Sequence, residues 1–159
     1  MSTQSFDDAK NLLVHDAPDD WQATVRFGLS EQLAEDWEKA VVGVRDDDSN
    51  FVLFDLQWDE DRRGIEFSLE RDGARQQEGR VWPAPGTDDL GTELWFRLTR
   101  TGDTYRAAWS TDGTTFVDVG GSLVLEADDP QLMLAGYGKR NGDSSRSVTF
   151  REVTVTDVP

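Results

Sequence analysis

The chain has 159 residues, the length of a single globular domain, and contains no cysteine. Its 16 Lys and Arg against 32 Asp and Glu give a formal net charge of -16. A field of this sign argues against nucleic acid and membrane as partners, and the missing cysteines exclude a disulfide framework, a thiolate nucleophile and a cysteine-based zinc site.

The N-terminal residues 1–10, MSTQSFDDAK, lack the basic start and apolar run of a secretory signal. We expect them to form a loose N-terminus of a single domain spanning 1–159. As given, the chain is expected in the cytoplasm. It would be extracellular if it had been cut from a longer secreted protein. The only histidine, His15, has no nucleophile motif around it, and we interpret it as a strand-end or loop residue.

Strand-like alternation of apolar and polar residues begins at residue 21. Residues 21–28 (WQATVRFG), 51–58 (FVLFDLQW) and 64–71 (GIEFSLER) follow it, so each segment is expected to bury one face. Between them, residues 29–41 (LSEQLAEDWEKAV) carry apolar side chains every three to four positions. Two interpretations stay open there: one short helix near 30–40, or an acidic loop leading into a strand at Val41.

Residues 46–50, DDDSN, place oxygen-bearing side chains at the spacing of an EF-hand calcium loop. The remainder of that loop is missing, because Phe51 stands where a glycine is needed and Gln57 where a bidentate glutamate is needed. The pattern therefore predicts a turn between two strands. No cofactor is required. The metal that the acidic loops would hold is a structural Ca²⁺, although no ligand set can be named.

The second half of the chain continues as strands. Residues 93–120 predict strand, turn, strand, turn, strand, with turns at 101–103 (TGD) and 111–113 (TDG). Residues 131–138 and 147–157 add two more strands, the last with a bulge after Phe150. Some ten short strands with regular turns predict an all-β fold, and a two-sheet antiparallel jelly-roll sandwich fits the length best.

Three segments carry a family resemblance: LWFRLTRTGDTYRAAWSTDGTTF, VVGVRDDDSNFVLFDL and LMLAGYGKRNGDSSRSVTFREVTV. They resemble the concanavalin A-like, laminin-G-like β-sandwich domains appended to bacterial glycoside hydrolases and their stand-alone relatives, over roughly residues 20 to 156. The resemblance implies two curved antiparallel sheets, with a concave face that binds saccharide in many relatives. Fold alone does not establish sugar binding.

The six tryptophans favour a surface on which sugar rings stack beside hydrogen-bonding side chains. From the alternation we predict a ligand-binding surface of Asp55, Gln57, Trp95, Arg97, Arg106 and Tyr137. The alternative is that these are ordinary sheet residues whose arginine stems cover aromatic rings.

The leading hypothesis is a non-catalytic, lectin-like module that binds oligo- or polysaccharide. A structural or protein-interaction sandwich without a sugar ligand, fused to or bound by another protein, is the alternative. A glycoside hydrolase is a weaker hypothesis, because the nearest carboxylate pair, Glu66 and Glu70, lacks a family motif. No catalytic residue is assigned.

Overall fold

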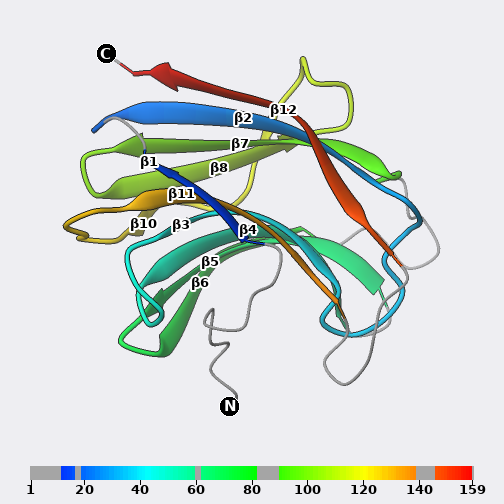
Figure 1. Cartoon of the computed structure of the whole chain (residues 1–159), viewed down its shortest axis with the longest axis horizontal. Coiled ribbons are helices and arrows are strands. Elements are labelled where there is room, and N and C mark those ends of the chain that lie inside the picture. Colours follow the sequence, from blue (N-terminus) through cyan, green and yellow to red (C-terminus); the bar gives the residue numbers. More distant parts are fainter. Residues whose placement is uncertain (1–11, 17–18, 60–61, 82–89, 139–145, 159) are drawn as a thin grey trace.

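The computed structural model describes residues 12–16, 19–59, 62–81, 90–138 and 146–158, which form two packed antiparallel sheets (Figure 1). The all-β jelly-roll-like sandwich is confirmed. No helix in this part of the chain is long and apolar enough to cross a membrane. The predicted loose N-terminus, residues 1–10, lies outside the described residues.

Six strands form the first sheet. In spatial order they are β1 (Leu12–Asp16), β11 (Gln131–Tyr137), β3 (Lys39–Arg45), β4 (Phe51–Asp59), β5 (Arg62–Arg71) and β6 (Ala74–Val81). In Figure 1 these strands arch, and the hollow side is turned away from the other sheet. We call this the concave sheet and its outward side the concave face.

The second sheet, called the convex sheet, lies above the first in Figure 1. Its strands, in order, are β10 (Leu123–Val124), β8 (Thr104–Ser110), β7 (Glu93–Thr101), β2 (Trp21–Leu29) and β12 (Val148–Asp157), with β9 (Val117–Asp118) paired to β8. The predicted bulge is present, because the β12–β2 register shifts between Phe150 and Glu152.

The core lies between the sheets and consists of the inward-facing residues of each strand. At its centre the rings of Phe54 and Phe96, one from each sheet, stack at a centroid distance of 3.9 Å. Phe27 meets Phe96 edge to face at 4.9 Å. Aromatic pairs of this kind add to the free energy of burial, and they fix which side of β4 and β7 faces outward.

The short helix that was one interpretation of residues 30–40 is wrong. These residues form an irregular loop, in which Trp37 has a positive φ of 77°. The backbone N–H groups of Ala34 and Glu35 donate to the carboxylate of Glu38, and Arg146 holds the same carboxylate at 3.0 Å. The alternative, an acidic loop leading into a strand, is correct, and β3 begins two residues earlier than expected, at Lys39.

The predicted turns are confirmed. Between β3 and β4, Asp47 accepts hydrogen bonds from the Ser49 backbone and the Asn50 side chain, while Asp48 forms an ion pair with Arg45 at 2.6 Å. DDDSN is thus a turn closed by its own side chains.

The two predicted turns at 101–103 and 111–113 are also present, and their glycines, Gly102 and Gly113, have φ values of 56° and 72°. Such values suit glycine.

Three strands were not predicted: β1, β6 and the two-residue β10. β6 has the sequence ARQQEGRV, which is too polar to show alternation, and it pairs with β5 across a turn at Asp72 and Gly73. β1 contains His15 and pairs with β11, a strand from the far end of the chain.

Candidate functional site

The structure divides the six predicted site residues between the two outer faces of the sandwich. Asp55 and Gln57 on β4 and Tyr137 on β11 lie on the concave face, where Lys39 of β3 is the cross-strand neighbour of both Gln57 and Tyr137. The other three, Trp95, Arg97 and Arg106, belong to β7 and β8 of the convex sheet. Two separate groups therefore replace the single surface that was predicted.

The concave group is the more elaborate of the two. Strand register places Asp55 opposite Glu66 of β5, and Glu66 opposite Arg80 of β6. Gln57 lies one position along the same face of β4. Charged and amide side chains thus run across the middle of the arch, and we call them the polar half of the concave face.

Ion pairs and hydrogen bonds hold the polar half in two neighbouring groups, one around Asp55 and one around Glu66. Lys39 Nζ lies 3.3 Å from Asp55 Oδ2, and both side chains are buried, at 2% and 0% exposure. Gln57 Nε2 donates to Glu66 Oε2 at 2.9 Å, and Arg80 donates to the same oxygen through Nε at 3.1 Å. Arg75 forms an ion pair with Glu66 Oε1. Glu66 is therefore the anchor of two cations.

One oxygen of this network is left over. Asp55 Oδ1 is buried and has no hydrogen-bond partner in the described part of the chain. A buried carboxylate oxygen without a donor is costly, since such groups are almost always satisfied. It marks the point where the polar half has capacity for a further N–H or O–H group.

The other half of the concave face is apolar. A buried cluster of Val41, Phe51, Leu53, Met133 and Ala135 fills it, and the ring of Tyr137 packs against this cluster. Tyr137 itself is only partly buried and marks the border between the halves. Burial, followed by the charge of Asp55, raises the pKa of the Tyr137 hydroxyl, so the group stays a neutral hydroxyl at physiological pH.

Glu66, Lys39 and Arg80 were missed as site residues by sequence reasoning. Alternation did place Glu66 and Glu70 on one strand face, but the cations that meet Glu66 come from a strand that was not predicted. Both Asp55 and Glu66 are fully buried and held in ion pairs. Their arrangement does not favour a glycoside hydrolase, which needs two reachable carboxylates flanking the scissile bond.

The convex group consists of rings covered by their neighbours. The Arg26 guanidinium lies 5.1 Å from the centre of the Trp95 ring, and the Arg97 guanidinium lies 3.6 Å from that of Phe116. A methyl group added at Gly113 would come within 2.8 Å of Trp95, so the turn packs directly on the indole. These contacts agree with arginine stems and a turn covering aromatic rings.

The turn at STDGTTF is held by one carboxylate. Asp112 Oδ1 accepts hydrogen bonds from the backbone N–H groups of Thr114 and Thr115 and from Ser110 Oγ. The bond from Thr115, followed by that from Thr114, holds the pKa of Asp112 well below its usual range. This carboxylate therefore has a structural role in a hairpin.

The acidic loops offer no evident calcium site within the described residues. No group of three or more His, Asp or Glu side chains is placed there to hold a metal ion. The Ca²⁺ expectation stays a prediction.

Comparison with known proteins gives structural neighbours only. No family model and no curated protein matches the chain. A functionally unknown protein from Saccharomyces cerevisiae is 21% identical with a TM-score of 0.68, over 92% of this chain and 74% of that one.

A xylan β-1,4-xylosidase from Bacillus halodurans C-125 is 10% identical with a TM-score of 0.76, over 99% of this chain and 31% of that one. CG-16, a homodimeric agglutinin from chicken liver, is 12% identical with a TM-score of 0.53, over 91% and 99%. These identities show a shared β-sandwich fold and nothing finer. The chain spans about a third of the length of the xylosidase.

Proposed function

We propose that this chain is a non-catalytic, carbohydrate-binding β-sandwich of the concanavalin A-like type, with its saccharide site on the concave face. The observation that carries the proposal is the polar half of that face, where two neighbouring bonded pairs, Lys39 with Asp55 and Gln57 with Glu66, lie beside a partly exposed tyrosine. Hydroxyl groups of a sugar need such paired donors and acceptors, and its apolar ring face suits an aromatic neighbour.

The residues divide into those that contact the sugar and those that position them. Tyr137 would stack on a sugar ring. Arg75 and Arg80, whose side chains are 43% and 28% exposed, would donate to hydroxyls. Glu66 is fully buried and fixes both arginines, while Asp55 fixes Lys39. Because these side chains are already held in place before the sugar binds, binding costs less conformational entropy. We expect weak, reversible affinity.

The fold shared with a xylosidase and an agglutinin supports this proposal at a coarse level only. A second candidate, a structural or protein-interaction sandwich, is favoured by one specific observation. Asp55 and Glu66 are 0% exposed, and ion pairs occupy the middle of the concave face. A packing role would use this network to fix the shape of the sheet.

Affinity electrophoresis against plant and microbial polysaccharides separates the two candidates. We expect at least one polysaccharide to retard the wild type, Tyr137→Ala to abolish the retardation, and Trp95→Ala, on the opposite face, to preserve it. Running the gels with calcium and with a chelator tests the Ca²⁺ prediction. Retardation lost only in Trp95→Ala would move the site to the convex face. No retardation by any polysaccharide would favour the packing role.

A further inference from the structure

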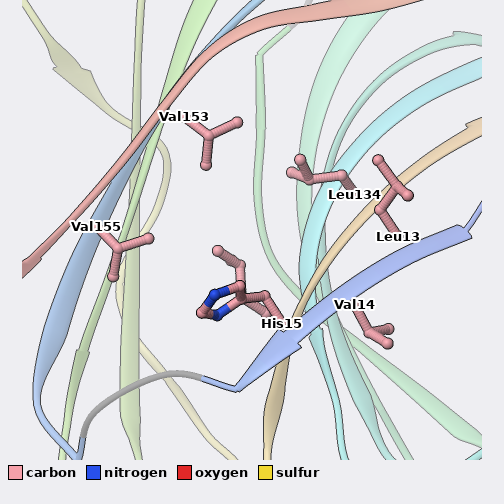
Figure 2. A pocket seen from close by; sticks show the side chains of 7 residues that line it. Leu13, Val14, His15, Leu134, Val153 and Val155 are labelled. Atoms are coloured by element: carbon pink, nitrogen blue, oxygen red, sulfur yellow. The ribbon is translucent and has the colours of Figure 1, made fainter.

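The concave face is more informative about a ligand than the open side of the sandwich. At the open side a cavity of about 490 Å³ lies between the edge strands β1 and β12, and its lining, shown in Figure 2, is aliphatic apart from His15. An apolar lining fits any apolar occupant and so identifies none. On the concave face, by contrast, Asp55 Oδ1 is a buried acceptor that no donor of the described chain reaches. A hydrogen bond requires a particular group at a particular distance, so this oxygen carries chemical information.

The surroundings of Asp55 explain why its second oxygen has no partner. The residues that flank Asp55 in β4 belong to the core, so its carboxylate lies on the concave side of the sheet. Across the strands it faces Val41, which is aliphatic, and Glu66, which is itself a carboxylate. Neither an aliphatic side chain nor an ionised carboxylate donates a hydrogen bond. Lys39 Nζ is the donor that the described chain provides, and it binds Oδ2, at 3.3 Å.

Lys39 has unused hydrogen-bonding capacity beside that oxygen. An ammonium group carries three N–H donors, and in the described part of the chain only Asp55 accepts from Lys39 Nζ. The pair thus presents donors and an acceptor next to each other, at 2% and 0% exposure. Its two charges cancel, so the group that completes it has to be neutral and has to both donate and accept. A hydroxyl does both through one atom.

We propose that the Lys39–Asp55 pair selects neutral saccharides, by binding one unsubstituted sugar hydroxyl that donates to Asp55 Oδ1 and accepts from Lys39 Nζ. This selectivity rests on the proposed saccharide site of the concave face. An ether or ester oxygen at the same position accepts but does not donate, so it would leave Oδ1 buried without a partner. A carboxylate there would be repelled by Asp55 and the buried Glu66, and an amine would be repelled by Lys39.

Access to the pair runs past Tyr137. Because Lys39 and Asp55 are buried, a hydroxyl reaches them only after a neighbouring side chain shifts. Tyr137 lies directly opposite Lys39 in the β11–β3 register and is only partly buried. Burial, followed by the charge of Asp55, raises the pKa of its hydroxyl, and the second cause shows that the polar end of the ring is near that carboxylate. A shift of the ring toward solvent would open the pair and leave the ring to stack on the sugar.

Affinity electrophoresis of the full chain tests the selectivity, in neutral xylan, β-glucan and galactomannan and in anionic polygalacturonate. At least one neutral polymer should retard the wild type, and the affinity for polygalacturonate should be at least about tenfold lower. The double variant Lys39→Met/Asp55→Val, which removes both charges, should lose at least about tenfold in affinity for the neutral polymer. Arg26→Met, which breaks an ion pair of the convex sheet, is the matched control and should be retarded like the wild type.

Nuclear magnetic resonance of the lysine side chains gives a readout that a purely structural ion pair would not move. The chain has three lysines, and the ¹⁵N signal of Lys39 Nζ is identified by its loss in Lys39→Arg. Oligosaccharides cut from the retarding neutral polymer are the probe, and they should shift this signal because Nζ gains an acceptor. The measurement uses the wild-type chain, so it decides the question even if the double variant unfolds.

The outcomes distinguish failure of the selectivity from failure of the saccharide site. Equal retardation of the double variant and the wild type, or stronger retardation in polygalacturonate, would overturn the selectivity and keep the site. An unshifted Lys39 signal in the presence of a retarding sugar would do the same, and would leave Asp55 Oδ1 to a bound water. No retardation by any of the polymers would overturn the proposed function, and the selectivity with it.

Discussion

The buried ion pair between Lys39 and Asp55 gives the sharpest test of how the concave face is built. Its atoms are 3.3 Å apart, and the side chains are 2% and 0% exposed. Lys39→Met keeps the aliphatic stem but leaves the Asp55 charge buried without its partner. Breaking a buried pair in this way costs about 3–5 kcal/mol.

Urea denaturation followed by tryptophan fluorescence would measure this loss. With a slope of about 2 kcal/mol per molar urea, the midpoint should fall by about 1.5–2.5 M. The double variant Lys39→Met/Asp55→Val replaces the pair by apolar side chains next to the buried Val41. Its stability should return to within about 1.5 kcal/mol of the wild type, since removing both charges also removes their desolvation cost.

The control is a partly exposed group of ion pairs, in which Arg26, 29% exposed, binds Glu93 and Glu152. Arg26→Met should lower the free energy of unfolding by no more than about 1 kcal/mol. A loss below about 1 kcal/mol in Lys39→Met, or a double variant as unstable as the single ones, would refute the view that this pair is buried and charged.

Two further predictions concern the hairpin of the convex sheet. Gly113→Ala should lower the free energy of unfolding by about 1–3 kcal/mol, because the φ of Gly113 is 72° and the added methyl group meets Trp95. Gly102→Ala should lower it by only about 1 kcal/mol, because Gly102 has a φ of 56° but nothing lies within 4 Å of the added methyl group. Urea denaturation of the two variants compares these losses. The hydrogen bond from Thr115 lowers the pKa of Asp112 from its usual 3.8, so its contribution to stability is present above that value and lost as the pH falls through the lowered one. Asp112→Asn should therefore flatten the stability profile between pH 5 and pH 2, and an unchanged profile would contradict the assignment.

Local patterns in the sequence were sufficient for most of the strands. Alternation is a property of neighbouring residues, so it identified β2, β4, β5, β7, β8, β11 and β12, as well as the bulge after Phe150. Turn chemistry is local too, and it predicted the glycines at 102 and 113 and the DDDSN turn. The all-β sandwich follows from the number and spacing of these elements.

Only the tertiary structure decided which outward faces belong together. Alternation shows that Asp55 and Trp95 both point out of the core, but the sheet to which each strand belongs depends on pairing between segments far apart in the chain, such as β11 with β3. The conformation of the loop at 30–38 and the existence of the polar strand β6 also became visible only in the tertiary structure. Glu38 caps the loop with help from Arg146, and β6 is held by pairing with β5. The contact from Arg146 and the pairing of β11 with β3 are long-range, so a pattern of neighbouring residues does not reveal them. Strand β6 is part of a local hairpin, but its polar sequence lacks the alternation by which a strand is recognised.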